Sequence, residues 1–226
     1  MSTHDSIEKT PVLWKSFFED VTKRHAPEAR IVRKSGSWLM RAIGLVLKPF
    51  NPKFMTAYIT TVGQTIYVPD DFSEQDELQA LSVIAHETQH IIDYKKNRVL
   101  FALGYLFPQF LALFALLGVF GFFNPWMFLW FLALGFLAPI PAPWRYRAEL
   151  NGYRVSILMG RVIHHYSESE FVQVRDWIKN QMTTGDYYFT WPFPSKIEQD
   201  LRDESFIMEP RYQEILEFLR AQGKIV

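Results

Sequence analysis

The stretch His86-Glu87-Thr88-Gln89-His90 places two imidazoles four residues apart, with a carboxylate next to the first. In a helix, His86 and His90 lie on one face and can reach the same metal ion, while Glu87 is rotated by about 100° and can contact a water on that ion. Zinc bound in this way lowers the pKa of the water to about 7, and Glu87 can then take its proton. The pattern predicts a zinc-dependent hydrolase; two histidines that merely pack in a core helix are the alternative.

The residues around this stretch predict that it is helical. Ser73 is a candidate N-cap with Asp76 three positions on, and further acids suit the positive end of a helix dipole. Small or apolar residues then recur at spacings of three and four, without Pro or Gly, at Leu78, Leu81, Ile84, Ala85, Thr88 and Ile92. We therefore expect a buried helix that starts near Ser73 and carries both histidines.

A catalytic zinc site needs a third protein ligand and one open position. Residues 145–153 read as another helix in which Glu149 is the only acid, so Glu149 is the predicted third ligand. A surface carboxylate paired with Arg145 or Arg147 at helical spacing is the alternative. Asp93, near the same helix face as the histidines, is expected to orient a ligand imidazole or, failing Glu149, to bind the metal itself.

A stretch without any charged residue runs from Val99 to Trp144 and is dominated by Leu, Phe, Ala, Gly and Trp. A membrane-spanning helix needs about 20 apolar residues, so the stretch is long enough for two, and Asn124-Pro125 supplies a turn between them. We expect an inserted transmembrane helical hairpin at residues 99–143, with helices at 99–123 and 125–143. Prolines within these residues shorten the uninterrupted helical segments. A hairpin that enters and leaves on one side of the membrane, or lies in its plane, is therefore an alternative, and so is a pair of helices buried in a soluble core.

A hairpin returns the chain to the side that it left, so His90 and Glu149 can share one metal. Basic residues flank the insertion at Lys95, Lys96, Arg98, Arg145 and Arg147. Positive charge next to a membrane segment favours the cytoplasmic face. We therefore expect an integral membrane protein with its catalytic domain on the cytoplasmic side. The absence of cysteine excludes disulfides and thiolate ligands.

The chain is balanced overall, with 24 basic and 24 acidic residues, but residues 21–53 contain eight Lys and Arg against Glu28 alone. Within them, residues 38–48 are apolar enough to lie on a membrane surface; a solvated basic face is the alternative. No motif for reading nucleic acid is present, and none is expected as a partner. Membrane lipid and a polypeptide substrate are the expected partners, and no feature predicts an oligomeric state.

Residues 54–61 and 65–68 are rich in Thr, Tyr, Ile and Val and predict a β-hairpin just before the metal-binding helix. An edge strand there can receive an extended peptide, although it can equally be a structural ribbon. The expected fold is mainly α (α+β): a single zincin-like helical metallopeptidase domain, residues 1–226, with a small β-hairpin and the inserted transmembrane hairpin.

This order of elements resembles the HtpX-type membrane zinc metallopeptidases and their CAAX prenyl-protease relatives over roughly residues 55–155. The resemblance implies a gluzincin core in which His86, His90 and Glu149 bind zinc and Glu87 is the general base.

The chain also departs from that family. Gln89 stands where a Gly commonly precedes the second motif histidine, and Gly152 and Tyr153 replace a small residue followed by Asp. The membrane segments that the family carries ahead of the motif are missing as well. The resemblance therefore supports metal binding more strongly than it supports a particular class of substrate.

These features together predict a membrane-integral zinc-dependent endopeptidase that hydrolyses peptide bonds of membrane-associated or unfolded proteins by means of a Glu-activated zinc-bound water. The alternative is a non-catalytic, membrane-anchored interaction or lysis-related protein that retains a zincin-like helix. Further candidates for orienting a ligand or stabilising an oxyanion are Asp93, Tyr153, Arg154, His164 and, in an aromatic loop, Tyr187.

Overall fold

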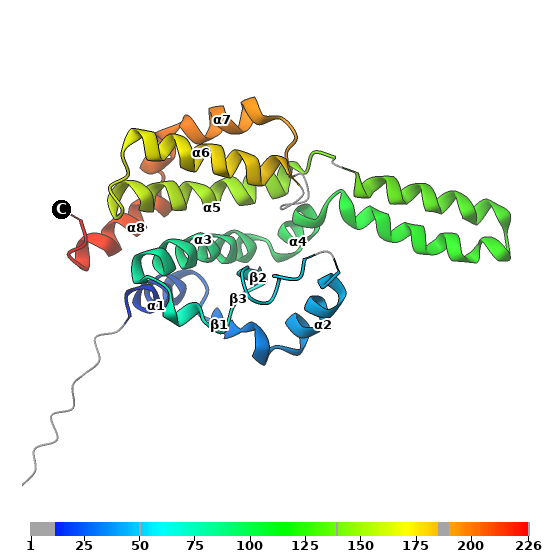
Figure 1. The fold of residues 1–226 in the computed structure, drawn as a ribbon, viewed down its shortest axis with the longest axis horizontal. Helices are drawn as coiled ribbons and strands as arrows, with labels where there is room; N and C mark the ends of the chain where they lie inside the picture. Colours follow the sequence, from blue (N-terminus) through cyan, green and yellow to red (C-terminus); the bar gives the residue numbers. More distant parts are fainter. Residues whose placement is uncertain (1–11, 50, 139, 185–189, 226) are drawn as a thin grey trace, which may run out of the picture.

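Two long helices, α3 and α5, lie side by side at the centre of the molecule (Figure 1). Helix α3 spans Glu77–Lys96 and helix α5 spans Pro143–Val162. The computed structural model of the chain describes residues 12–49, 51–138, 140–184 and 190–225. Over these residues the protein is mainly helical with one small sheet, which confirms the predicted fold class at this level.

Helix α3 begins at Glu77 because Asp76 caps it. The Asp76 carboxylate accepts hydrogen bonds from the backbone N–H groups of Leu78 and Gln79, at 3.1 and 3.0 Å, and so satisfies two of the donors that a helix N-terminus leaves free. The start expected near Ser73 is therefore wrong, since Phe72–Glu74 forms a separate short 3-10 helix, η2. Beyond the cap, Leu81, Ile84, Ala85 and Thr88 of the predicted stripe are buried, and Leu78 and Ile92 are partly buried against the core.

A small sheet packs against α3 and has the strand order β1-β3-β2. Its strands are β1 (Arg30–Arg33), β2 (Thr60–Val62) and β3 (Thr65–Val68). Strands β2 and β3 form the predicted antiparallel hairpin, and Gly63 turns it with a φ of +61°, which glycine adopts without strain. The first strand is shorter than the predicted residues 54–61, because hydrogen-bonded turns occupy residues 51–57. Strand β1, which no sequence pattern predicts, pairs in parallel with β3 and leaves β2 at the edge.

The other helices of the body cover α3 and α5 from two sides. They are α1 (Leu13–His25), α2 (Trp38–Leu47), α4 (Arg98–Leu106), α6 (Glu168–Thr183), α7 (Pro194–Arg202) and α8 (Pro210–Ala221), with short 3-10 helices η1 (Lys34–Gly36) and η6 (Glu204–Met208). Helix α1 packs on α3, and α6 and α7 pack on the side of α5 (Figure 1). The apolar faces of α1, α3, α5, α6, α7 and α8 meet in one core, which includes Phe17, Ile84, Leu158, Ile178 and Leu219. This close-packed core fixes α3 against α5.

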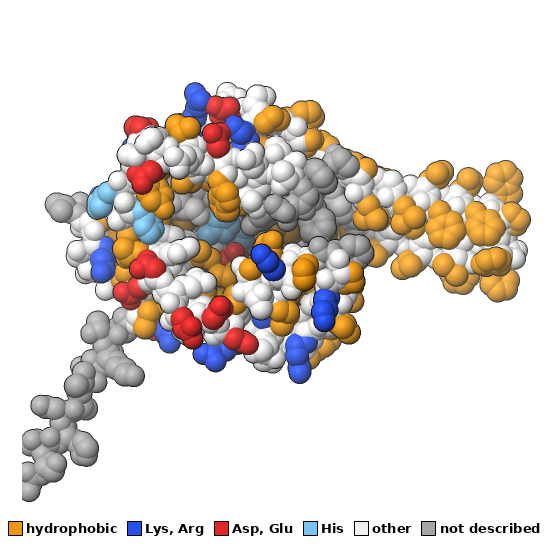
Figure 2. Space-filling view, viewed as in Figure 1, with side chains coloured by type: hydrophobic (Ala, Val, Ile, Leu, Met, Phe, Trp, Pro, Cys, Tyr) orange, Lys and Arg blue, Asp and Glu red, His pale blue; other side chains and the backbone are white. Residues whose placement is uncertain are grey.

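The uncharged stretch forms an arm that projects from the body (Figure 1). After α4 the chain bends by 73°, and the arm then consists of two long 3-10 helices, η3 (Gln109–Phe122) and η4 (Pro125–Leu137), packed against each other. Figure 2 shows hydrophobic side chains along the arm, while the charged side chains lie on the body. The helices expected at 99–123 and 125–143 are therefore wrong in extent, because the bend at Phe107 and Pro108 separates α4 from the arm.

Small residues explain how the arm packs. They recur at every third position along η3, at Ala112, Ala115, Gly118 and Gly121. A 3-10 helix has three residues per turn, so these positions align on one face. The rings of Phe131 and Phe128 fill the gaps, since a Cβ at Gly118 would lie 3.0 Å from Phe131 and one at Gly121 only 2.4 Å from Phe128.

The arm and α4 together reach the dimensions of a membrane segment. No single helix among the described residues is both long and apolar enough to cross a bilayer, but α4 and η3 reach that length and composition as a pair across their bend. The transmembrane hairpin stays a prediction.

Candidate metal centre

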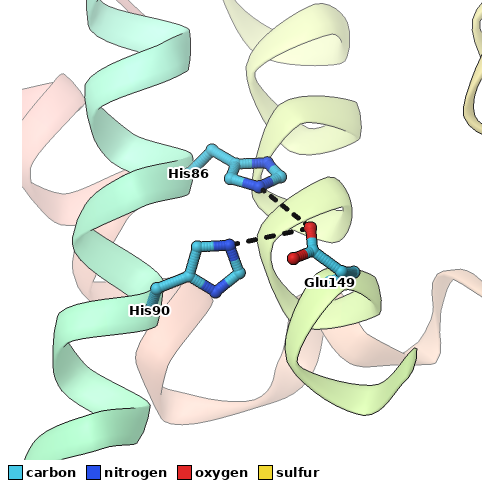
Figure 3. A group of neighbouring side chains, drawn as sticks. All are labelled: His86, His90 and Glu149. Atoms are coloured by element: carbon cyan, nitrogen blue, oxygen red, sulfur yellow. Dashed lines mark ion pairs between the residues drawn. The ribbon is translucent and has the colours of Figure 1, made fainter. Parts of the chain in front are cut away.

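His86 and His90 on α3 converge with Glu149 on α5 in the middle of the body (Figure 3). The Nε2 atoms of His86 and His90 lie 3.8 and 3.7 Å from Oε2 of Glu149. All three side chains are buried, and Glu149 is only 1% exposed. The structure therefore brings together the three ligands that the sequence predicts, although Glu149 is 59 positions from His90 and 63 from His86 in the chain.

The geometry of this group fits a metal ion better than a set of hydrogen bonds. The separations of 3.7 and 3.8 Å are too long for hydrogen bonds. They are close to the distance of about 3.4 Å between ligand atoms that each lie about 2.1 Å from a tetrahedral zinc ion. Among the described residues, Oε2 of Glu149 is one of several buried side-chain atoms without a hydrogen-bond partner, which is costly unless another group binds there. The group can hold a metal ion, although imidazole and carboxylate donors suit several divalent metals and not zinc alone.

The charges of these side chains support each other. Burial alone would raise the pKa of Glu149, but His90, His86 and the Tyr105 hydroxyl outweigh it and lower the pKa to about 2. Burial alone would lower the pKa of His86, but the Glu149 carboxylate 3.8 Å away and the charge of Glu87 raise it above its usual range. The carboxylate is therefore held ionised, as a metal ligand must be.

His86 lies directly against the backbone of α5. Its Nδ1 is 3.2 Å from Oγ of Ser156, a contact that orients the ring and leaves Nε2 directed at Glu149. A Cβ at Gly152 would lie 2.6 Å from Nε2 of His86, closer than atoms of a folded protein approach. Gly152 is thus needed for the close approach of the two helices.

Tyr105 lies on α4, close to the start of the arm, and contacts Glu149. Its hydroxyl donates a hydrogen bond to Oε1 of Glu149 at 2.5 Å. Arg145 in turn donates from Nε to the backbone carbonyl of Tyr105 at 2.8 Å, and from Nη2 to Oε1 of Gln109 at 3.0 Å. Arg145 therefore braces α4 and does not pair with Glu149, so the surface ion pair considered for Glu149 is excluded.

Sequence reasoning missed Tyr105, although one signal could have found it. Tyr105 is the only hydroxyl-bearing side chain between residues 99 and 144. A lone hydroxyl in so apolar a stretch needs a hydrogen-bond partner when it is buried, and a carboxylate is the strongest acceptor available.

Glu87 lies beside the metal centre and lines a cleft of about 380 Å³. Its Oε2 accepts a hydrogen bond of 2.6 Å from the Thr61 hydroxyl on β2. The cleft is also lined by His86, His90 and Glu149, by residues 59–63 around β2, by Tyr94, and by Phe101, Ala102, Tyr105 and Leu106 of α4. The cleft thus brings the predicted general base, the metal centre and the edge strand to one space.

Asp93 has a structural role close to the centre. Its Oδ2 accepts from Nδ2 of Asn151 at 2.8 Å, and its Oδ1 lies 3.0 Å from Nζ of Lys96 and 3.8 Å from Arg211. Asp93 ties α3 to α5 without contacting His86 or Glu149, so the roles of imidazole partner and reserve ligand are not supported.

The remaining predicted residues divide between the centre and its surroundings. The Tyr153 ring packs edge-on against the His86 ring, with centroids 5.0 Å apart. Arg154 instead lies 4.0 Å from Asp203. His164 contacts Ser82 at 3.1 Å. The structure therefore places Tyr153 at the centre and the other two away from it, while Tyr187 lies outside the described residues.

Comparison with known proteins finds no family model, no protein of curated function and no solved structure that matches the chain. The functional argument therefore rests on the side chains and their geometry.

Proposed function

We propose that the chain is a zinc-dependent endopeptidase anchored in a membrane by its arm, with the body on the cytoplasmic side. One observation carries the proposal: the buried group of His86, His90 and Glu149, with an unpartnered carboxylate oxygen, opens on a cleft that Glu87 lines and β2 borders. A core needs none of these polar groups for packing, because burying them costs free energy.

Zinc suits this set of donors. Two imidazoles and one carboxylate are a known ligand set for catalytic zinc, with a further position left open. When bound, the metal supplies a water with a lowered pKa and polarises the carbonyl of the substrate. The partners on Glu149 and His86, namely Tyr105 and Ser156, orient the ligands from the side opposite the cation.

Glu87 is positioned to act as the general base. Its carboxylate lines the cleft beside the proposed metal ligands. The Thr61 hydroxyl donates a hydrogen bond to Oε2 of Glu87, which orients the carboxylate. The other oxygen can accept the proton of the attacking water and later give it to the leaving amine.

The edge strand suits a polypeptide substrate. Strand β2 pairs with β3 on one side and lies at the edge of the sheet on the other. An extended peptide can add to such an edge through backbone hydrogen bonds, which require no particular side chains. Addition to β2 would lay a substrate backbone along the cleft that contains Glu87.

The arm supports the membrane part of the proposal. A 3-10 helix rises about 2.0 Å per residue, so the 14 residues of η3 extend over about 28 Å, against about 30 Å for the hydrocarbon core of a bilayer. Its surface is apolar, with Leu116, Phe122 and Leu132 more than half exposed. An exposed apolar surface of this extent marks contact with a membrane or a partner. The basic residues that flank the insertion favour the cytoplasmic side for the body.

Glu87→Gln tests the catalytic part of the proposal. The variant keeps the shape of the side chain but cannot take a proton, so cleavage of a fluorescently labelled unfolded protein should fall by about 10²- to 10⁴-fold. The zinc content and the thermal unfolding of the detergent-purified protein should stay as in wild type. Equal cleavage by wild type and variant, or none by either, would contradict the proposal.

Metal analysis tests the centre independently of activity. Purified wild type should contain close to one zinc per chain, and His90→Ala and Glu149→Ala should both lose it. His164→Ala is the matched control, since His164 lies outside the group and should leave the zinc content unchanged. Wild type without zinc would remove the basis of the proposal, whereas retention in Glu149→Ala would reassign the third ligand.

A further inference from the structure

Helix α2 exposes an apolar face that none of the described residues of the body covers. Of its ten residues only Met40 is buried, while Trp38, Leu45 and Val46 are 74%, 74% and 71% exposed. Such exposure is unusual for a helix of this composition, because an apolar helix in water normally turns most of its surface to a core.

The stretch of sequence that contains α2 is basic and has no acidic residue. The sequence from Ala29 to Pro69 contains six Lys and Arg and not one Asp or Glu. Three of the basic side chains, Arg41, Lys48 and Lys53, are exposed on α2 or in the turns that follow it. Figure 2 shows basic and hydrophobic side chains side by side at this end of the body. The patch therefore suits a partner that offers negative charge next to an apolar phase.

The position of α2 agrees with such a partner. Helix α2 lies at the end of the body from which the arm projects (Figure 1). Helix α4, which leads into the arm, has a second exposed apolar face at Val99, Leu100 and Leu103. Arm, α4 and α2 thus present apolar surface at one end of the molecule, and a bilayer around the arm would meet the other two.

We propose that the exposed face of α2 docks on the surface of an anionic lipid bilayer, beside the point where the arm enters it. The proposal rests on the membrane part of the proposed function, since the arm sets the distance of α2 from the lipid. Trp38 suits the interface of headgroups and acyl chains, and Leu45 and Val46 enter the upper part of the acyl layer. Each basic residue near an anionic surface strengthens binding by roughly fivefold, so Arg41, Lys48 and Lys53 together contribute about a hundredfold.

Docking of α2 has a consequence for the cleft. The α4 residues Phe101, Ala102 and Tyr105 line the cleft, and Val99 and Leu103 are exposed on another side of the same helix. With α2 and α4 on the lipid, only the thickness of α4 separates the cleft from the bilayer surface, about 10 Å. Polypeptide that emerges from the membrane is then the substrate within closest reach.

The absence of cysteine from the chain permits a direct test. Leu45→Cys carries a fluorophore on α2, Leu129→Cys carries one on the arm, and Val172→Cys on α6 is the control for an exposed position away from the patch. The full-length variants are reconstituted into vesicles of phosphatidylcholine, with or without phosphatidylserine, that contain a nitroxide-labelled lipid as quencher. We expect position 129 to be quenched in both lipids, position 45 strongly only with phosphatidylserine, and position 172 in neither.

A charge reversal sharpens the test. Arg41→Glu combined with Lys48→Glu should remove the quenching at position 45 and leave that at position 129 unchanged, and high salt should act in the same direction. Docking is overturned if position 45 resembles position 172 in both lipids, or is quenched equally in both. An unquenched position 129 with a quenched position 45 would support docking and contradict the arm, so the two proposals fail in different ways.

Discussion

The metal centre and the arm depart from the usual distribution of side chains in opposite directions. The centre buries three ionisable groups, including a carboxylate oxygen without a hydrogen-bond donor. The arm exposes large apolar side chains, with Phe122 and Phe123 more than four-fifths exposed. In water each arrangement costs free energy, the first through desolvation and the second through contact with solvent. A bound cation would offset the desolvation of the buried ligands, and a lipid phase would remove the contact of the arm with water.

The two regions also differ in what holds them together. Directed polar contacts orient the ligands at the centre, such as Tyr105 on Glu149 and Ser156 on His86. The arm relies on shape alone, with phenylalanine rings packed against glycines. A single lost hydroxyl should therefore disturb the centre, whereas the arm should respond to added bulk at Gly118 or Gly121 and, in lipid, to charge. Tyr105, on the helix that leads into the arm, joins the two regions.

Charge in the arm should have the largest effect. Leu116→Arg combined with Leu132→Arg places two arginines near the middle of η3 and η4, on exposed positions. Each costs about 2.5 to 3.5 kcal/mol at the centre of a bilayer, or roughly 5 to 7 kcal/mol together. The variant should leave the membrane fraction on carbonate extraction, while its zinc content stays as in wild type.

The control for the arm places the same charges on the body. Val172→Arg combined with Met208→Arg substitutes two exposed apolar positions outside the arm and should not change the fractionation. A double-arginine arm that still resists carbonate extraction would show that the arm does not lie in lipid.

Gly152→Ala should have the next largest effect, and on the metal centre alone. The added methyl would lie 2.6 Å from Nε2 of His86 and must displace the ring. Overpacking of this kind costs about 1 to 3 kcal/mol, which corresponds to a zinc affinity roughly tenfold to a hundredfold lower in chelator competition. Gly135→Ala in the arm has no described atom within 4 Å of the new methyl and should leave the affinity unchanged. Wild-type affinity in Gly152→Ala would mean that His86 is not a ligand in this position.

Tyr105→Phe should lower the zinc affinity by roughly tenfold, because partners of metal ligands contribute about that much. The change removes only the hydroxyl that donates to Glu149. Tyr94→Phe makes the same change on another tyrosine of the cleft and is the matched control. If both variants bind zinc equally well, the hydrogen bond from Tyr105 to Glu149 does not contribute to zinc affinity.

Asp93→Asn should have the smallest effect, on stability and its pH dependence. Burial raises the pKa of Asp93, but the hydrogen bonds from Asn151 and Lys96 outweigh it and hold the pKa below its usual range. The ionised group therefore stabilises the folded state above about pH 4, and this contribution is lost as the pH falls through the lowered pKa. The variant should lose about 1 kcal/mol at neutral pH, and thermal unfolding in detergent should depend less steeply on acid. Glu74→Gln, at an exposed carboxylate, should show neither change.

The parts of the fold that sequence reasoning predicts are the local ones. The helix that carries His86 and His90, the hairpin of β2 and β3, and the helix that carries Glu149 follow from spacing, capping and turn residues. The predicted boundaries fail where a local cap or turn differs from the expected one. Asp76 rather than Ser73 caps α3, and residues 51–57 turn where a strand is expected. The arm was expected as two α-helices, but small residues at every third position of η3 match the 3-10 form.

The spacing of His86, Glu87 and His90 needs nothing beyond one helical turn, so the chain specifies it locally wherever that turn forms. The partnership of these residues with Glu149, Tyr105 and Ser156 depends on how α3, α4 and α5 pack, and the contacting residues are 15 to 70 positions apart. Contacts at such separations are set by the shape of the whole core, because many packings share the same local patterns and only the favourable sum of all contacts selects one. The candidate ligands could therefore be read from the chain, while their convergence and the bracing of Glu149 were decided by the tertiary structure.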